Sequence, residues 1–261
     1  MGDVKHVVLI HGNWSRGEQL ADVRAAFEQL GFTAHTPTLR HHELPVDEGA
    51  PKIATLRVRD YVDDLVAFVE GLDGPPLLVG HSMGGLLAQL VAARTPHVGL
   101  VAACPAPAAG INASTPANRR MARPMFMRAR PWARPIPPPS FERCREWIGN
   151  AQSEYTAREI YEGLVCESGR AQWEMLLSTV RLSKATVVDY AAITTPVLAL
   201  GGEFDLIVPA RAVRQTASRF WQGASVQVAG ADHMVFSGAA LPATMRHITK
   251  WMTRNHLLPN Q

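Results

Sequence analysis

The chain has 261 residues, of which 47% are hydrophobic and 19% are charged, so it is long and apolar enough to bury a substantial core in one large domain. Its formal net charge of +3 is too small a basic excess to indicate a nucleic-acid-binding protein, and we expect no nucleic-acid partner. No apolar run approaches the roughly 18 residues that a membrane-spanning helix needs, so we expect no membrane span.

The N-terminus and the cysteines indicate the cellular compartment. The chain passes from Met1 into the strand-like His6–Ile10 without the cationic start of a signal peptide. Cys104, Cys144 and Cys166 lack CxxC spacing, which fits free thiols in a reducing compartment better than disulfides or a zinc site. We therefore expect a cytoplasmic protein without a metal. A secreted protein whose signal peptide was removed before this numbering begins is the alternative.

Short apolar runs alternate with helical patterns over the first hundred residues, which is typical of βαβ units around a parallel sheet. The expected strands are residues 7–10, 32–36, 77–79 and 100–103, and the expected helices are residues 17–30, 57–72 and 83–93. In the second helix Tyr61 and Leu65 share an apolar face opposite Asp60 and Asp64. We interpret these aspartates as a solvated helix face rather than a carboxylate site.

Residues 111–186 interrupt this alternation. The segment is rich in Arg, Pro, Trp and Met, and the run from Pro135 to Pro139 excludes a single regular element, so we expect helices around a polyproline-like turn. The alternation returns in a strand over 196–200, a helix over 210–220, a strand over 225–228 and a helix over 241–254. The sequence thus predicts an α/β fold with a mostly parallel central sheet flanked by helices. Residues 1–110 and 187–261 form its core, and residues 111–186 form an inserted helical cap or lid.

The segment Gly80-His81-Ser82-Met83-Gly84 fits the pattern G-x-S-x-G of a nucleophile elbow, in which a strand turns sharply into a helix and exposes a serine. A chain of this length contains the bare pattern by chance roughly one time in ten, so the pattern alone is only suggestive. Here an apolar strand precedes it and a helical pattern follows, as the elbow requires. A phosphate-binding loop would need a lysine after its glycines, and none is present. We therefore predict Ser82 as a nucleophile.

A serine hydroxyl becomes a nucleophile only when a base removes its proton and an acid orients that base. His233 lies in a loop after the last short strand, and Asp205 follows the strand over 196–200, which gives the chain order Ser, Asp, His. Taken singly, a loop histidine is more often a surface group and an aspartate before a helix is more often a cap. Joined to Ser82 in this order, the two are predicted as base and orienting acid. Glu203 and Asp189 are the alternative acids, and we expect Asp232 to order its own loop.

Cleavage of an acyl bond also needs two N–H donors for the developing oxyanion. We predict the backbone amides of Met83, directly after the nucleophile, and of Asn13, in the loop after the first strand. Gly12 permits close approach of the backbone to a ligand. We interpret His11 as a structural hydrogen bonder rather than a second base. Trp14 either walls the acyl pocket or packs against the lid.

The run Val8-Leu9-Ile10-His11-Gly12-Asn13, the elbow at Ser82, the strand end with Asp205 and the loop Gly230-Ala231-Asp232-His233-Met234 together resemble the α/β-hydrolase superfamily. The first run and the last loop are similar, more narrowly, to the small methylesterases and hydroxynitrile lyases. The resemblance covers the core and not the cap. It implies an eight-stranded, mostly parallel sheet, a helical cap after the sixth strand, no cofactor and an acyl-enzyme intermediate.

The cap carries two further patterns. Its arginines outnumber its acids between residues 119 and 145, where only Glu142 is acidic and the arginines are Arg119, Arg120, Arg123, Arg128, Arg130, Arg134, Arg143 and Arg145. Such a run either attracts an anionic substrate, an acidic partner or a membrane surface, or forms a solvated face. Its apolar side chains either line a pocket over Ser82 or only pack the cap on the core. The pocket residues we expect are Trp14, His81, Met125, Trp132, Trp147 and Met234.

These patterns predict a serine hydrolase that cleaves a small-molecule carboxylic ester with a hydrophobic acyl or alkyl group, without a cofactor, as a monomer or homodimer. The same triad also permits cleavage of a lactone, amide, thioester or C–C bond, and hydroxynitrile lyase or perhydrolase chemistry. A non-catalytic ligand-binding receptor on the same fold is the alternative from another class.

Overall fold

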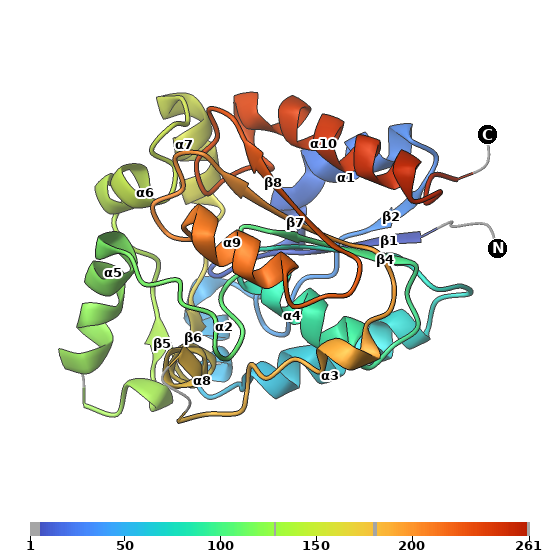
Figure 1. Cartoon of the computed structure of the whole chain (residues 1–261). Helices are drawn as coiled ribbons and strands as arrows, with labels where there is room; N and C mark the ends of the chain where they lie inside the picture. The colour runs from blue at the N-terminus through green and yellow to red at the C-terminus, as the bar shows by residue number, and fades with distance from the viewer. Residues whose placement is uncertain (1–5, 128, 180–181, 260–261) are drawn as a thin grey trace.

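A computed structural model describes residues 6–127, 129–179 and 182–259. Figure 1 shows a central sheet with helices on both of its faces, and a group of further helices at one end, remote from the two chain termini. Among the described helices, none combines the length and the hydropathy that crossing a lipid bilayer requires.

The central sheet consists of parallel strands in the order β2-β1-β3-β4-β7-β8. These strands are β1 (His6–Ile10), β2 (Thr33–His35), β3 (Leu77–His81), β4 (Gly99–Ala103), β7 (Val197–Gly202) and β8 (Gly223–Val228). Strands β3, β4 and β7 are buried along their whole length. This burial explains why the sequence shows them as short continuous apolar runs without polar alternation.

The sheet is smaller than the family resemblance implied. Six strands of the described residues form it, not eight, and the inserted helical segment follows β4, the fourth strand along the chain, not the sixth. Strand β2 forms one edge and β8 the other. The mostly parallel sheet flanked by helices is confirmed.

Successive residues of a strand face opposite sides of the sheet, and the two faces bury separate apolar clusters. Val7 and Leu9 of β1 pack in the cluster that contains residues of α1 (Ala21–Gln29) and α10 (Leu241–Arg254). The neighbouring residues of β1 pack instead with helices α3 (Val58–Glu70), α4 (Met83–Ala92) and α9 (Ala210–Ala217).

Two details differ from the predicted elements. The helix expected over 17–30 begins as a 3-10 turn, η1 (Gly17–Leu20), before α1. Helix α2 (Val46–Ile53) was missed because Gly49 and Pro51 are poor helix formers and hide its pattern.

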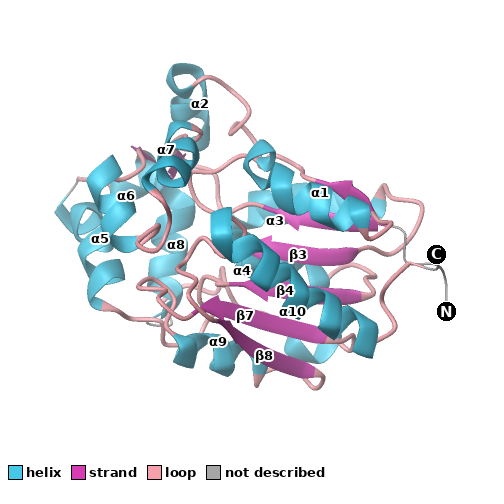
Figure 2. Ribbon diagram, turned by 90° about the horizontal axis from the view of Figure 1, so that it is seen from above, coloured by secondary structure: helices cyan, strands magenta, loops and turns pink. Residues whose placement is uncertain are grey.

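The predicted insertion, residues 111–186, lies between β4 and β7, and we call these residues the cap segment. Figure 2 shows its helices gathered at the end of the sheet toward which the strands point. In chain order its elements, with the short turn that follows it, are α5 (Pro116–Met127), η2 (Pro131–Ala133), β5 (Pro135–Ile136), α6 (Phe141–Trp147), α7 (Glu154–Glu162), β6 (Glu167–Ser168), α8 (Gly169–Thr179) and η3 (Tyr190–Ala192). The start of the proline run forms β5, which pairs antiparallel with β6. The division of the chain into core and cap stays a prediction.

Helix α4 begins in direct backbone contact with the sheet. A Cβ atom added to Gly84 would lie 2.1 Å from the carbonyl oxygen of Ile10, and one added to Gly80 would lie 2.1 Å from the carbonyl oxygen of Gly84. Contacts this short involve main chain on both sides, so rotation of a side chain cannot relieve them. The glycines therefore allow the turn between β3 and α4 to be tight.

We expect Gly84→Ala to lower the free energy of unfolding by about 3 kcal/mol, because the methyl group must push α4 away from β1. Urea denaturation of the purified variant measures this loss. The matched control is Gly74→Ala, because an added Cβ there meets nothing within 4 Å, and its effect should stay below about 0.5 kcal/mol. Equal stability of the two variants would contradict this account of the turn.

Candidate active site

Ser82 occupies the turn between β3 and α4 in a strained backbone conformation. Its φ is 53° and its ψ is −118°, outside the regions that a residue with a side chain normally adopts. Such a conformation costs about 1–3 kcal/mol and persists only when its surroundings enforce it. Here the Ser82 amide donates to the carbonyl of Ala103 at 2.9 Å, and the Ser82 carbonyl accepts from Gly85 at 2.9 Å. The local geometry is that of a nucleophile elbow.

The structure brings the three predicted triad side chains together. Nε2 of His233 lies 3.0 Å from Oγ of Ser82, and Nδ1 of His233 lies 2.9 Å from Oδ2 of Asp205. Ser82 is half-buried, whereas His233 and Asp205 are buried. A hydrogen-bonded chain thus runs from a carboxylate through an imidazole to a hydroxyl, as activation of a serine requires.

Main-chain amides fix Asp205 in this chain. Its Oδ1 accepts from the amides of Ile207 at 2.8 Å and Val208 at 2.9 Å, which leaves Oδ2 for His233. Burial raises the pKa of this carboxyl, but the charge and hydrogen bond of His233 and the two amides outweigh burial and lower the pKa below its usual value. Asp205 therefore caps the turn that follows it, as aspartates before a helix often do, and it also accepts from His233 through its other oxygen.

The charges around His233 raise its pKa and so favour the protonated imidazolium. Burial lowers its pKa, but the Asp205 carboxylate, its hydrogen bond and the nearby Asp232 together raise the pKa above 6.5. His81 behaves in the opposite way, because burial and the neighbouring His233 lower its pKa to about 4. Neutral His81 donates from Nε2 to the carbonyl of His233 at 2.8 Å and so supports the loop that carries His233.

The three other acids have different positions. Glu203 is exposed and accepts from the amide of Gly230 at 2.8 Å, and Asp189 accepts from the amide of Ala191 at 3.2 Å. Asp232 is fully buried and accepts from its own loop, at the Met234 amide. It also accepts from two residues of the cap segment: the amide of Ala151 at 2.7 Å and Nε2 of Gln152 at 2.9 Å. Asp232 therefore ties the histidine loop to the cap segment, which its place in the sequence did not indicate.

One cluster of metal-ligating side chains lies at the triad. Ligand atoms of His81, Cys104 and His233 lie within 4.8 Å of one another. The set fits a metal poorly, because both ring nitrogens of His233 are hydrogen-bonded to Asp205 and Ser82. Burial also raises the pKa of the Cys104 thiol well above its usual value, which disfavours the thiolate that a metal needs. We interpret the cluster as support for the triad.

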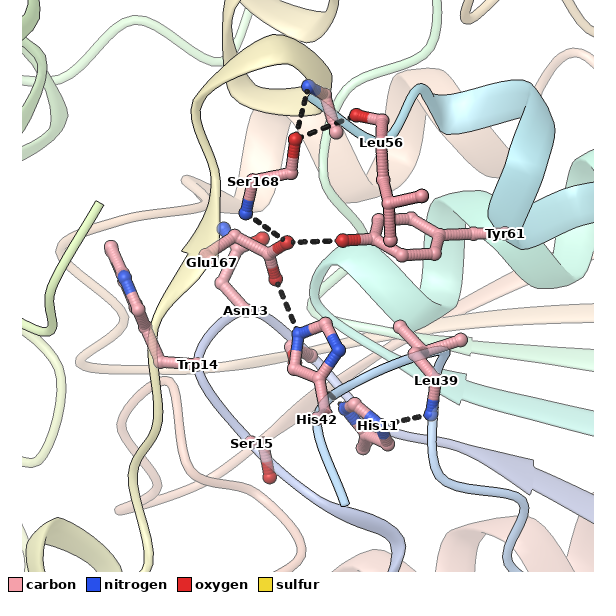
Figure 3. A network of polar contacts seen from close by, with 12 residues as sticks. His11, Asn13, Trp14, Ser15, Leu39, His42, Leu56, Tyr61, Glu167 and Ser168 are labelled. Atoms are coloured by element: carbon pink, nitrogen blue, oxygen red, sulfur yellow. Dashed lines mark hydrogen bonds and ion pairs between the residues drawn. The ribbon is translucent and has the colours of Figure 1, made fainter. Parts of the chain in front are cut away.

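The loop after β1 lies directly against Ser82. A Cβ atom added to Gly12 would lie 3.0 Å from Cβ of Ser82, a tighter contact than most side chains make, so glycine favours this close approach. His11, below the loop, accepts at Nε2 from the amide of Leu39 at 3.0 Å and donates from Nδ1 to the carbonyl of Gly12 at 3.0 Å (Figure 3). Burial lowers the pKa of His11 to about 3 and keeps it neutral, which suits a structural hydrogen bonder rather than a base.

A cavity of about 110 Å³ opens over Ser82 and His233. Its cap side is mostly apolar and includes Met121, Ile148, Ile160 and Leu164. Of the predicted pocket residues, Trp14, His81 and Met234 line this cavity.

Met125, Trp132 and Trp147 are not among the described residues that line the cavity. Met125 and Trp147 are buried in the cap segment, and the indole of Trp132 packs 5.6 Å from that of Trp173. The pocket assignment fails for these three because other residues of the cap segment face the cavity. They include Met121 of α5, Cys144, Arg145 and Ile148 of α6 and its end, and Ala157, Ile160 and Tyr161 of α7. The pattern of apolar residues alone did not distinguish these faces.

Comparison with known proteins places the chain in a family. The model of the alpha/beta hydrolase family matches residues 7–241, which is most of the chain. The protein therefore belongs to the alpha/beta hydrolase family. No curated protein gives a significant match.

Solved structures show the same fold at low sequence identity. The monoacylglycerol lipase of Paleococcus ferrophilus superposes with a TM-score of 0.72 at 20% identity, over 98% of this chain and 97% of that one. A thermophilic esterase from Thermogutta terrifontis gives 0.66 at 20% identity, over 98% and 92%. A pyrethroid hydrolase from Sphingobium faniae JZ-2 gives 0.62 at 20% identity, over 95% and 97%. The chain thus spans nearly the full length of each of these proteins.

We expect kcat/KM for an ester to rise with pH as His233 loses its proton, because the imidazolium cannot accept the proton of Ser82. Since Asp205 and its surroundings raise the pKa of His233, half of the maximal rate should be reached above pH 6.5. A profile of initial rates from pH 5 to 9 measures this midpoint. Asp205→Asn should move the midpoint to lower pH and reduce kcat by about 10³–10⁴. A flat wild-type profile, or an unchanged midpoint in the variant, would contradict the assignment.

Proposed function

We propose that the protein is a serine hydrolase that cleaves carboxylic esters through an acyl-enzyme intermediate. The observation that carries the proposal is the hydrogen-bonded chain Asp205–His233–Ser82, with its serine end at the cavity. In this proposal Ser82 is the nucleophile, His233 is the general base and then the general acid, and Asp205 orients the imidazole.

In the acylation step, Oγ of Ser82 attacks the ester carbonyl carbon while its proton passes to Nε2 of His233. The carbonyl oxygen becomes an oxyanion. When the tetrahedral intermediate collapses, the bond to the alkoxy group breaks and His233 returns the proton to the leaving alcohol. Asp205 stays ionised throughout and stabilises the imidazolium, in line with its lowered pKa.

Two backbone amides are proposed to stabilise the oxyanion. Met83 is the first residue of α4, and the first amides of a helix have no acceptor within that helix. The second donor is the amide of Asn13. Asn13 directly follows Gly12, whose backbone lies against Ser82. Removal of one such donor typically costs about 10²–10³ in kcat.

In deacylation a water molecule takes the place of the alcohol. His233 removes its proton, the hydroxide oxygen bonds to the acyl carbon, and the bond to Ser82 Oγ breaks as the serine recovers its proton. These steps use only protein groups and water.

The cavity lining supports an ester with an apolar acyl or alkyl group. The names of the structural neighbours, a monoacylglycerol lipase, an esterase and a pyrethroid hydrolase, refer to proteins that act on esters. At this level of identity they support the proposed class and not a particular substrate.

We expect Ser82→Ala to lower kcat for p-nitrophenyl butyrate by at least about 10³-fold, because no other group can form the acyl-enzyme. The variant should also lose covalent labelling by a fluorophosphonate, which intact-mass spectrometry measures. Ser218→Ala is the control, because this residue lies at the exposed end of α9. A Ser82 variant that kept a tenth of the activity would refute the assignment, and an unlabelled wild type would favour a receptor without turnover.

We expect kcat/KM to rise from the acetate to the hexanoate p-nitrophenyl ester by up to about fourfold per added CH₂, since each buried CH₂ contributes about 0.8 kcal/mol. Leu164→Asn should weaken this dependence because Leu164 lines the cavity. Leu182→Asn is the matched control, because this leucine is 75% exposed. Lactones and thioesters assayed in parallel test the other reactions that the same triad permits, and faster turnover of either would replace the simple ester as the substrate class.

A further inference from the structure

The loop that carries Asn13 is held in an unfavourable conformation. The amide of Ser15 donates to the carbonyl of Gly12 at 3.3 Å, which closes a tight turn around Asn13 and Trp14. The φ of Trp14 is +61°, a value that glycine adopts readily and a large aromatic residue rarely does. A conformation of this kind needs neighbours that enforce it.

Those neighbours come from three separate parts of the cap segment. The carbonyl of Trp14 accepts from the amide of Val165 at 2.7 Å, and its indole donates to the carbonyl of Ile136 at 3.1 Å. Oδ1 of Asn13 accepts from Nε2 of Gln172 at 2.6 Å. The cap segment therefore binds both central residues of the turn, and it binds Asn13 through its side chain, which leaves the backbone amide free of this contact.

Gln172 lies in the first turns of α8, and a buried anchor fixes the start of this helix. Oγ of Ser168 donates to the carbonyl of Leu56 at 2.6 Å and accepts from the amide of Ala171 at 3.1 Å, so it caps α8 and joins it to the core. Glu167 is fully buried, and its Oε1 accepts from the Tyr61 hydroxyl at 2.8 Å. Figure 3 shows these contacts beside the loop with Asn13 and Trp14.

The second oxygen of Glu167 faces a buried histidine. Oε2 lies 3.2 Å from Nε2 of His42, and Nδ1 of the same ring lies 3.3 Å from the carbonyl of Arg40. Because both ring nitrogens face acceptors, these contacts favour the imidazolium form of His42. Burial opposes both charges, yet their attraction and hydrogen bonds raise the pKa of His42 and lower that of Glu167. A buried ion pair contributes little net stability compared with apolar packing, which makes a role in fixing one geometry the better account of its presence.

We propose that the cap segment completes the oxyanion hole: Gln172 is a positioning residue that holds the Asn13 turn against Ser82, and the buried Glu167–His42 pair fixes the helix that carries Gln172. This inference rests on the proposed function, in which the amide of Asn13 stabilises the oxyanion. Its consequence is that catalysis depends on cap residues that touch neither the substrate nor the triad.

The decisive variant is Gln172→Met, which keeps the size of the side chain and removes its amide. We expect kcat for p-nitrophenyl butyrate to fall at least about tenfold, while KM stays within about twofold. This loss is smaller than the loss of about 10²–10³ in kcat on removing an oxyanion-hole donor, because the Asn13 amide remains present. Gln215→Met is the matched control, because this glutamine is also half-buried and its amide joins α9 to residues 110 and 112 of the main chain. The control should keep wild-type kcat, and thermal unfolding of both variants reports any general loss of stability.

Two further measurements separate positioning from general damage. A trifluoromethyl ketone forms a tetrahedral adduct with Ser82, whose proton passes to His233 while the ketone oxygen becomes an oxyanion. Its affinity for Gln172→Met should fall by the same factor as kcat, as for an interaction made only in the transition state.

Asn13→Ala keeps the backbone amide and removes the side chain that Gln172 holds, so it should cause a similar loss. The double variant should lose no more than either single one, because the two changes remove one contact. Additive losses, or a fall in kcat without a matching fall in ketone affinity, would overturn the proposal.

Glu167→Gln tests the anchor. The glutamine oxygen can still accept from Tyr61 and Ser168, but the charge pair with His42 is lost, so we expect kcat to fall at least about threefold at unchanged KM. Unchanged kcat in Glu167→Gln would refute the role of the pair, and unchanged kcat in Gln172→Met would refute the role of Gln172. Both outcomes presuppose an active wild type. A wild type without Ser82-dependent turnover or ketone binding would instead refute the proposed function.

Discussion

The close backbone contact between α4 and the central strands is the constraint on which the rest of the site depends. Gly80 and Gly84 allow the chain to leave β3 and enter α4 within a turn too tight for any other residue, and this turn holds Ser82 at a strained φ of 53°. Strand β1 takes part in the same contact through the carbonyl of Ile10. One packing arrangement therefore fixes Ser82, which we propose as the nucleophile, together with helix α4 and the loop that follows β1.

Much of the core could be predicted from the sequence, because its signals are local. The apolar run before Gly80 and the helical pattern after Met83 predicted the nucleophile elbow. The order of Asp205 and His233 along the chain predicted the proposed triad. The structure brings these side chains within hydrogen-bond distance. The number of strands was wrong, because it came from the family resemblance and not from the residues.

The cap segment was harder to predict, for a physical reason. Trp132 and Trp147 are large apolar residues of the kind that line pockets. Which face of a helix meets the cavity depends on how the helix is rotated about its own axis, and tertiary packing decides this rotation. The contact of Gln172 with Asn13 joins residues 159 positions apart, and nothing local in either segment indicates it. The pairing of His42 with Glu167 likewise has no local signal, since the two lie 125 positions apart and only the fold brings them together. Arg128 of the basic run lies outside the described residues, and Arg119, Arg120 and Arg123 are exposed.

Asp232 forms a second contact between the cap segment and the site, separate from the one at Asn13. Its carboxylate binds the amide of Ala151 and the side chain of Gln152, directly beside the catalytic base that we propose. A hinge motion that lifted the whole cap would break this tie and the one through Gln172 together, so both the base and the anion-stabilising turn would lose support at the same moment. The proposed base and the proposed anion-stabilising turn thus depend on the same seated position of the cap segment.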